Sequence, residues 1–511
     1  MLTNRSWFLS VAFCNSPSVH SRPATMDETA FSSGSMYSSG EEEILASEGL
    51  RLSRSVRWRE VSNRHVNFEP ALFLFCFALG LSEIELTHQI IYQTCCVQGF
   101  QRSDCLLVGT DANLPGVQEI EAQVKPVAAS VNTVIVVIKS VVPAFGALVM
   151  GAWSDRYGRK PVVVIAGCGL LLTYFALTGL SFLSSFIQVN PWYYVLAYIP
   201  FSLPGGMAVL GGTIYAFISD VSNEQNRTVK MGFMKGIIVA GGTLGSYSCR
   251  YILEWTNTTT VLVIATICIL FGLLYIALLV EDSIIPSTDS ELGSSLQALF
   301  SFGLLRELTE AIFRKRSRMV WQILLLIIGF GALMELAVDS NTISYNFANR
   351  HFEWNRNQFS HFQLSENALI VFANIVGIIS LKRIFSWPDT LVALIAIISH
   401  IICSTICGFA TVGWQFYAAT GLTFLKGMEE VAVLSLSSYL LQSNDMAKFY
   451  ALAMSINGLV PLASKSLFDY FYQSNPGLFY FVGAGIYVGG LVILISIQCL
   501  INKRNQPELL L

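Results

Sequence analysis

Two carboxylate side chains, Glu335 and Asp339, lie four residues apart within a long apolar stretch of the chain. Residues with this spacing share one face of a helix. Two carboxyl groups that are close together and away from water can hold a proton between them, because burial and mutual repulsion both oppose a second negative charge. The pair therefore predicts a site that takes up and releases a proton.

A second group of ionisable residues, Glu83, Glu85 and His88, lies in an apolar stretch nearer the N-terminus. Glu83 is about as far into its stretch as Glu335 is into the later one. If the two stretches are equivalent helices of an internal repeat, their carboxylates face one cavity. We therefore expect the three residues to join Glu335 there as proton or solute sites, and His88 can change its charge near neutral pH.

Lysine side chains in apolar stretches offer positive charge to an anionic solute. Lys235, Lys426 and Glu429 lie at membrane depth, where an ionisable group is costly and is usually functional. The alternative for Lys426 is an internal ion pair with Glu429 or Glu430, three and four residues further along. For Lys235, and for Glu83 and Asp339, the alternative is a side chain that extends to the nearest membrane surface.

A short polar loop between two apolar stretches has the sequence GAWSDRYGRK, residues 151–160. Its first glycine lets helices approach closely, and its second suits a tight turn. Its aspartate can pair with an arginine or cap the start of a helix, so the loop predicts a charged latch that breaks and re-forms as helices move. The alternative is a solvated basic loop. The latch residues are Gly151, Asp155, Arg156, Gly158, Arg159 and Lys160.

The elements that must position these residues follow from the composition. The chain has 511 residues, of which 53% are hydrophobic and 13% are charged, whereas an ordinary soluble domain carries about 25% charged residues. The apolar residues fall in runs of about twenty, the length that crosses a bilayer as a helix. These features exclude a soluble globular protein and predict an all-α membrane protein.

We expect twelve membrane-spanning helices in two six-helix halves, 65–280 and 319–500, with a cytosolic linker at 281–318. The expected spans are 68–92, 128–150, 162–187, 193–218, 231–252, 260–280, 319–345, 366–385, 389–411, 413–441, 449–472 and 478–500. Residues 1–64 are rich in serine and are expected to form a disordered tail, whether the chain starts at Met1 or Met26. Residues 501–511 form a second tail.

Basic residues in the connecting segments predict the orientation. Most lie on the side of both tails, whereas the other side holds Arg102, Lys125, Arg250, Arg350 and Arg356. Both termini are therefore expected in the cytosol, with the segments 93–127 and 346–365 outside. We expect a multi-pass protein of the plasma membrane rather than of the lysosomal membrane.

The outer segments carry two further features. Asn257 opens an Asn-Thr-Thr sequence, which predicts an N-glycosylation site. Cys95, Cys96 and Cys105 lie in a polar loop, where a local disulfide can form in an oxidising compartment.

Several functional classes are excluded. The sequence has no Cys/His spacing, P-loop or intramembrane HExxH motif, so we expect no metal, no cofactor and no enzymatic activity. The net charge is only -3, so nucleic acid is not an expected partner.

The loop at 151–160 resembles the signature of the major facilitator superfamily, G-x-x-x-D-(R/K)-x-G-(R/K)-(R/K), and fills all of its fixed places. Other stretches resemble the proton-coupled folate transporter family, solute carrier family 46: FEPALFLF, QIIY, GAWSDRYGRKP, FISDVSNEQNRTVKMG, Trp354-Asn355 and, more weakly, DMAKFYALA. The resemblance covers most of residues 68–500. It implies the major facilitator fold and proton-driven transport of an organic anion, such as a folate, or of another polar metabolite.

The sequence departs from that family at positions important for its chemistry. Where the resemblance places the family's proton-coupling glutamate, its span-7 histidine and its span-10 arginine, this chain has Lys235, Glu335 and Leu434. No cysteine lies beside Trp354, so the family's disulfide between two outer loops cannot form. The family's folate specificity and proton path are therefore not carried over residue by residue.

Together these features predict a secondary active transporter that works by alternating access, as a proton-coupled symporter of an organic anion. Its solute would be folate-like, pterin-like or another polar metabolite. Glu335 and Asp339 are the expected proton sites, and Lys235 or Lys426 offers positive charge to the solute. The expected partners are a small organic solute, protons and the lipid bilayer, and the oligomeric state is left open. The rival hypothesis is a non-transporting membrane receptor or scaffold on the same fold.

Overall fold

Every regular element in the described part of the chain is a helix. In the computed structural model this part comprises residues 68–108, 115–283, 318–337, 341–422, 425–441, 445–475 and 477–505. The predicted N-terminal tail, most of the predicted linker, residues 506–511 and Asp339 lie outside it.

The helices follow the chain in two groups. The N-terminal half contains α2 (Glu69–Val97), α3 (Arg102–Cys105), α4 (Pro115–Tyr157), α5 (Arg159–Ser184), α6 (Trp192–Ala197), α7 (Ile199–Ser202), α8 (Gly206–Asp220), α9 (Glu224–Trp255) and α10 (Thr258–Leu279). The C-terminal half contains α13 (Arg318–Ala337), α14 (Asn341–Phe352), α15 (Arg356–Phe372), α16 (Asp389–Phe409), α17 (Gly413–Leu422), α18 (Met428–Ser438), α19 (Met446–Ser474) and α20 (Leu478–Asn505). Two π-helical turns, η1 (Ala373–Gly377) and η2 (Ser380–Ile384), follow α15.

Ten segments among the described residues are long and apolar enough to cross a membrane. The two other predicted spans correspond to α9, which carries several charged residues, and to the interrupted pair α17 and α18. Helix therefore occupies every predicted span, and the predicted all-α membrane fold is confirmed.

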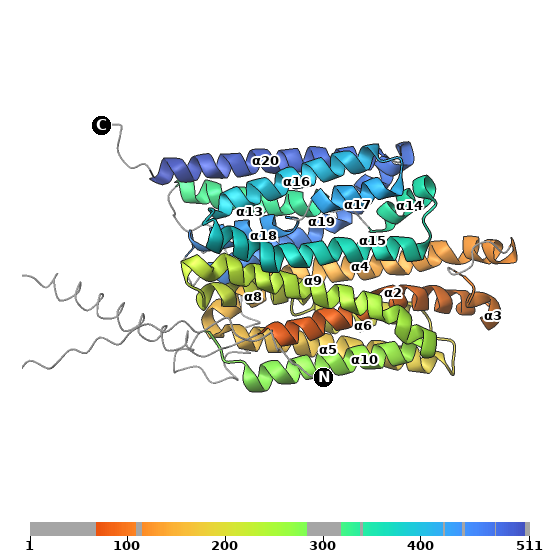
Figure 1. The fold of residues 1–511 in the computed structure, drawn as a ribbon. Coiled ribbons are helices and arrows are strands. Elements are labelled where there is room, and N and C mark those ends of the chain that lie inside the picture. The colour runs from red at the N-terminus through yellow and green to blue at the C-terminus, as the bar shows by residue number, and fades with distance from the viewer. Residues whose placement is uncertain are drawn as a thin grey trace, which may run out of the picture. The chain divides into compact units, whose positions relative to one another are not determined.

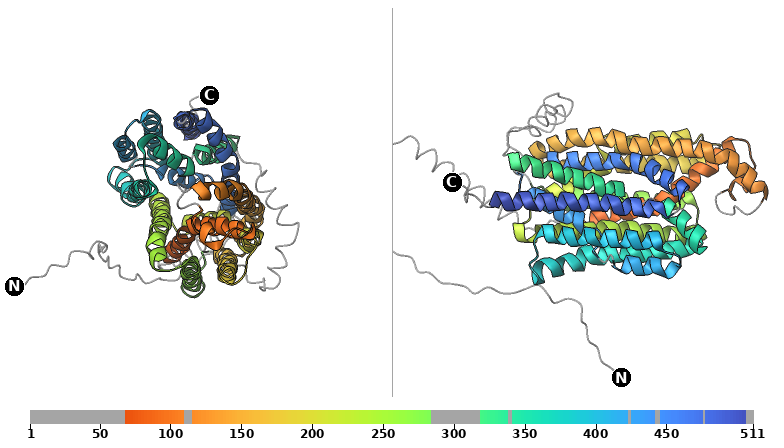
Figure 2. Two further views of the ribbon diagram at one scale, coloured as in Figure 1. Left: turned by 90° about the vertical axis from the view of Figure 1, so that its right-hand side faces the viewer. Right: turned by 90° about the horizontal axis from the view of Figure 1, so that it is seen from above.

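The two halves lie side by side, with the N-terminal half coloured red to green and the C-terminal half teal to blue in Figure 1. Within the N-terminal half, α2 packs on α9 and α10, and α5 packs on α8 and α10. Within the C-terminal half, α13 and α16 both pack on α20. Between the halves, α4 and α8 contact α19, and α9 contacts α15 and α18. The left view of Figure 2 shows the same helices end-on, and the right view shows them from above.

Glycines let α2 and α9 cross at close range. A Cβ atom on Gly245 would lie 2.2 Å from the carbonyl oxygen of Phe77, and one on Gly80 would lie 2.1 Å from that of Gly242. Small residues at such crossings allow backbones to approach within a membrane. This contact fixes α9, the helix that carries Lys235, against the first helix of the bundle.

The predicted spans 193–218 and 413–441 are divided in the structure, although we expected single helices. The first consists of α6, α7 and α8, with Pro200 in α7 and Gly205 at φ +107° before α8. The second consists of α17 and α18, with Gly427 at φ +88° before α18. Proline removes a helix hydrogen bond, and a left-handed glycine ends a helix. A prediction from runs of hydrophobic residues detects neither effect, and for this reason it gave single helices.

The predicted outer loop 93–127 is also largely helical, because α2 extends into it and α4 begins within it. Val124 on α4 is fully buried and packs with Cys95 and Cys105, which form the disulfide. Cys96 remains a thiol. We call this end of the bundle the disulfide end, and the end that carries the loop 151–160 the latch end.

Replacing Gly245 by alanine should destabilise the fold, because the added Cβ meets the backbone of α2. Overpacking of this kind costs about 1–3 kcal/mol, so we expect a lower Tm for the purified protein in detergent. Gly179→Ala in α5 is the matched control, since a Cβ there meets nothing within 4 Å. Equal Tm values for both variants would show that the close crossing is not needed.

Candidate functional site

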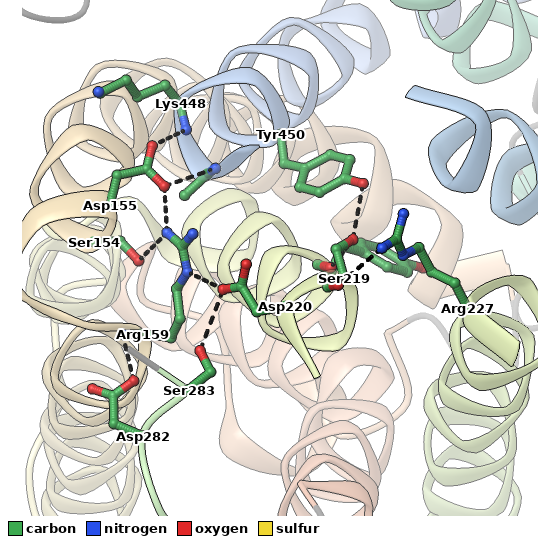
Figure 3. A network of polar contacts seen from close by, with 12 residues as sticks. Ser154, Asp155, Arg159, Ser219, Asp220, Arg227, Asp282, Ser283, Lys448 and Tyr450 are labelled. Carbon is green, nitrogen blue, oxygen red and sulfur yellow. Dashed lines mark hydrogen bonds and ion pairs between the residues drawn. The ribbon is translucent and has the colours of Figure 1, made fainter. Parts of the chain in front are cut away.

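Arg159 at the latch end is fully buried between two carboxylates. Its guanidinium lies 2.6 Å from Asp155 Oδ1 and 3.0 Å from Asp220 Oδ2, and Figure 3 shows it between the two carboxylates. It also donates a hydrogen bond to Ser154 Oγ. Buried ion pairs are favourable only when their hydrogen bonds are complete, and here a donor on α5 meets acceptors on α4 and α8. Arg159 therefore joins three helices of the N-terminal half.

Asp155 also contacts the C-terminal half. Its carboxylate accepts hydrogen bonds from the backbone N–H groups of Ala447 and Lys448, at 3.2 and 3.1 Å, in the first turn of α19 (Figure 3). These N–H groups have no partner within their own helix, so a carboxylate there stabilises the helix start. One turn earlier in α4, Gly151 lets the halves approach, since a Cβ there would lie 2.5 Å from Ala451 Cβ.

Two other latch residues, Gly158 and Lys160, make contacts within the N-terminal half. Gly158 has φ +115°, and a Cβ there would overlap the Asp282 carboxylate, which accepts the Arg159 backbone N–H at 2.9 Å. Lys160 Nζ donates to a carbonyl oxygen of α10 at 2.9 Å, and Arg156 is exposed. The latch residues thus hold α4, α5, α8 and α19 together, and their role in movement stays a prediction.

A second set of contacts between the halves lies at the latch end, and the sequence did not reveal it. Arg227 donates to Ser438 Oγ at 2.6 Å, and Thr228 donates to Asp389 Oδ1 at 2.9 Å. Lys382 pairs with the same aspartate at 2.8 Å. These contacts join the start of α9 to α16 and α18. The two α9 residues lie 211 and 161 residues from their partners, so local spacing carried no signal.

A cavity of about 400 Å³, which we call the C-half cavity, lies among the helices of the C-terminal half. Residues of α13, α15, α16, α18 and α19 line it, and α9 contributes Lys235 and Val239 from the other half. Its walls are largely apolar and aromatic. The acidic and basic side chains that line it, among the described residues, are Lys235, Glu335, Glu366, His400, Lys426, Glu429 and Glu430. The structure therefore brings together four of the predicted site residues from both halves of the chain.

Glutamates from other helices hold the two lysines. Lys235 Nζ lies 2.6 Å from Glu430 Oε2 on α18, and Lys426 Nζ lies 2.5 Å from Glu366 Oε1 on α15. The alternative of an internal pair between Lys426 and the next glutamates along the chain is wrong. Gly427 separates Lys426 from the start of α18, so helical spacing does not apply to it. Lys235 extends into the cavity, not to a membrane surface.

Glu429 pairs with His400, a residue that the sequence did not single out. His400 Nε2 lies 3.2 Å from Glu429 Oε1, and the other carboxylate oxygen accepts the Gly427 backbone N–H at 3.0 Å. The imidazole stacks on Tyr487 with 4.7 Å between ring centroids. His400 and Glu366 each stand alone among apolar or polar neighbours in the sequence, and only the packing of α15, α16 and α18 shows their partners.

Glu335 lines the same cavity from α13. Among the described residues no hydrogen bond or ion pair engages its carboxylate, although Lys235 and Glu430 are close enough to interact with it electrostatically. Asp339 lies outside the described residues, and α13 ends at Ala337, so a shared helical face for Glu335 and Asp339 stays a prediction. Glu335 is thus a cavity carboxylate that is available to a proton or a solute.

A second cavity, of about 750 Å³, lies at the disulfide end. Glu85 and His88 on α2 line it, together with Arg250 on α9 and His361 on α15. Glu85 accepts a hydrogen bond from Thr258 Oγ1 at the start of α10. We call this space the disulfide-end cavity.

The structure separates the two predicted carboxylate groups. Glu335 lines the C-half cavity, Glu85 and His88 line the disulfide-end cavity, and Glu83 is exposed and lines neither of these two. The expectation of one shared cavity was therefore wrong, because helices that correspond in a repeat need not direct their side chains into the same space. Asn257 is exposed at the disulfide end and caps α10, and its glycosylation stays a prediction.

Relatives of the chain support the resemblance noted in the sequence. A Drosophila melanogaster protein named probable peptidoglycan muropeptide transporter SLC46 is 29% identical, over 83% of this chain and 84% of the relative. The proton-coupled folate transporter of Bos taurus is 24% identical, over 80% of this chain and 86% of the relative. Homologues thus include members of solute carrier family 46.

Solved structures share the fold. The human organic anion transporter MFSD10 (TETRAN) matches with a TM-score of 0.63 at 13% identity, over 84% of this chain and 97% of that one. A variant of the Escherichia coli fucose:proton symporter FucP matches with a TM-score of 0.56 at 12% identity, over 84% and 97%. Residues 109–464 match the family model described as Major Facilitator Superfamily. This match spans well over half of the chain, which therefore belongs to the Major Facilitator Superfamily of membrane transporters and is not an enzyme.

Proposed function

We propose that this chain is a proton-coupled transporter that carries a carboxylate-bearing organic solute through the C-half cavity. The observation that carries the proposal is the presence of two lysine–glutamate pairs, Lys235 with Glu430 and Lys426 with Glu366, in one cavity. A carboxylate on a solute can take the place of either glutamate, because it offers the lysine the same charge-assisted hydrogen bond.

Exchange of this kind couples the solute to a proton. When a solute carboxylate replaces Glu430 at Lys235, the released glutamate is left in the cavity without its counter-ion. A negative charge without a partner is costly in this largely apolar cavity, and in the proposed mechanism a proton compensates it. One proton then accompanies each carboxylate, and the net charge of the cavity does not change.

The acid content of the cavity supports the same coupling. Among the described residues its lining includes four carboxylates, those of Glu335, Glu366, Glu429 and Glu430, against the basic side chains of Lys235, Lys426 and His400. An anion would be repelled by this surplus of carboxylates unless protons neutralise part of it. Glu335, which has no ion-pair partner among the described residues, is the proposed first proton site, and Asp339 is the second.

The positions that differ from the folate transporter pattern support a solute other than folate. Lys235, Glu335 and Leu434 all line the C-half cavity. A few placed polar groups determine what such a cavity binds, so three differences in one lining change its specificity. The Drosophila relative is named for muropeptides, which carry carboxylates and amides along a short peptide. We therefore place a muropeptide-like solute ahead of a folate or pterin.

Alternating access requires the latch end to open, and we propose that this end faces the cytosol. The excess of basic residues on that side supports the orientation. The disulfide between Cys95 and Cys105 supports an oxidising compartment at the opposite end, as outside the plasma membrane. At this end Asp155 joins α4 to α19 and Arg227 joins α9 to α18, and these are contacts that the proposed opening would break.

The rival function, a receptor or scaffold that does not transport, shares the fold and the cavity. A receptor would bind the solute without taking it up, and a scaffold would neither bind it nor take it up. A solute that raises the Tm of the purified protein without entering cells would favour the receptor.

Uptake of labelled N-acetylmuramyl dipeptide and of labelled folic acid by expressing cells tests the proposal. We expect uptake of the dipeptide to rise as the external solution is acidified, and Glu335→Gln and Asp339→Asn to lose that dependence because an amide cannot carry the proton. Glu119→Gln, on an exposed face of α4, is the control. Full pH dependence in both site variants would remove these residues as proton sites, and a lack of uptake of both probes would favour the rival.

Swapping the two residues of the Lys235–Glu430 ion pair tests whether Lys235 contacts the solute or only stabilises the fold. Lys235→Glu and Glu430→Lys should each lower the Tm, because like charges then face each other, and the double variant should recover it. Uptake by the double variant should stay about tenfold or more below that of the parent, since a misplaced ammonium loses a charged hydrogen bond of ~1.5 kcal/mol or more. Full recovery of uptake in the double variant would show that the ion pair has only a structural role.

Arg159→Met tests the latch. The change leaves the Asp155 and Asp220 carboxylates buried without their shared cation, which typically costs about 3–5 kcal/mol. We expect a large fall in the Tm and in uptake. Arg383→Met in η2 is the control, because Arg383 is exposed and its loss should change stability by less than about 0.5 kcal/mol. Similar effects of both changes would contradict a specific role for Arg159.

A further inference from the structure

Two cysteines lie next to each other on the wall of the C-half cavity. Cys403 and Cys407 are one helical turn apart on α16, their Sγ atoms are 3.9 Å apart, and both line the cavity. Both are thiols in the structure. Among the described cysteines, these are the thiols whose sulfur atoms approach each other, so the cavity contains a dithiol that the proposed transport mechanism does not use.

The helix opposes a disulfide between these thiols. Residues four apart on a helix have Cβ atoms about 5–6 Å apart, whereas a disulfide needs Cβ atoms about 3.5–4.5 Å apart. Cys403 and Cys407 lie well inside the continuous helix α16, which would have to distort to bring them closer. An atom placed between the two sulfurs bridges the wider gap without that distortion. The pair is therefore better suited to holding a ligand than to forming a disulfide.

The surroundings favour a ligand that two sulfurs can satisfy. Among the described residues no group of three or more His, Cys, Asp or Glu side chains could hold a metal ion, so an ion that requires three or more protein donors is disfavoured. The ion pair of Lys426 and Glu366 is close enough to interact electrostatically with Cys407. A ligand on the dithiol would thus lie beside one of the two lysine–glutamate pairs.

We propose that Cys403 and Cys407 form a bidentate binding site for thiophilic ligands, namely trivalent arsenicals, within the C-half cavity. In the binding reaction the two S–H bonds and the As=O bond of an arsenoxide break, two As–S bonds form, and the two protons leave with the oxygen as water. Arsenic stays trivalent and both sulfurs keep their oxidation state, so no oxidant or reductant is needed.

Binding at this site has a consequence that rests on the proposed function. An arsenical held by α16 occupies space that a solute needs and stands next to Lys426, whose exchange of partners the transport mechanism uses. The bound ligand therefore blocks transport. Binding itself does not depend on transport, so the two can be measured separately.

Intact-protein mass spectrometry with phenylarsine oxide tests the site directly on the full-length protein in detergent. We expect one adduct, formed with loss of one water, that survives a wash with 2-mercaptoethanol and is removed by 2,3-dimercaptopropanol, because a chelating dithiol is needed to compete with two protein sulfurs. Cys403→Ala and Cys407→Ala should each abolish the resistant adduct. Cys268→Ala on α10 and Cys499→Ala on α20 are the controls and should retain it.

Two results would overturn the site: a resistant adduct that persists in both cavity variants, or no resistant adduct on parent protein that is folded by its Tm. If an alanine variant does not fold, the serine variant at the same position replaces it. Uptake of labelled N-acetylmuramyl dipeptide then tests the link to function. Phenylarsine oxide should reduce uptake several-fold in the parent and not in Cys403→Ala. A resistant adduct without loss of uptake would leave the dithiol site in place and contradict the proposed transport route.

Discussion

A charge that is buried away from water needs a partner of opposite sign, and in this chain such partners come from different helices. Arg159 joins α4, α5 and α8 through two carboxylates, and Lys235 joins α9 of one half to α18 of the other. Replacing a buried pair by apolar residues can be harmless, but removing one partner is costly. The pairs therefore restrict how the helices can separate, and exchanging one partner for another is the least costly way to change them.

The two halves repeat one backbone feature at corresponding places. The fourth span of each half is interrupted at a left-handed glycine, Gly205 in the first and Gly427 in the second. Interrupted helices at corresponding positions of two repeats are a typical sign of a solute site in transporters. In the C-terminal half the interruption places Lys426 on the wall of the cavity together with Glu429 and Glu430 at the start of α18. In the N-terminal half the corresponding glycine instead packs tightly on α4.

The residue types and their local spacing predicted a good part of this arrangement. Helix at all twelve spans, the contacts available to Asp155 and the location of Lys235 and Lys426 within the helical bundle could be predicted from apolar runs and from charges within them. The partners of these charged and polar residues could not be predicted from local spacing. Lys235 and Glu430 are 195 residues apart in the sequence, and Thr228 and Asp389 are 161 apart. Such pairs are decided by how helices pack, and hydrophobic periodicity does not encode that packing.

The helix pair of α9 and α18 connects the C-half cavity to the latch end. Arg227 donates to Ser438 at the latch end, and Lys235 pairs with Glu430 in the cavity. Each contact lies eight residues from the other along both helices, which corresponds to about 12 Å at 1.5 Å per residue. The two helices run in opposite directions with matching register, and side-chain contacts join them both at the latch end and in the cavity. In the proposed mechanism, a solute that takes the place of Glu430 removes the contact in the cavity. Hydrogen bonds at the latch end then hold α9 and α18 together without that ion pair, so the same mechanism predicts that loading of the cavity favours opening at the latch end.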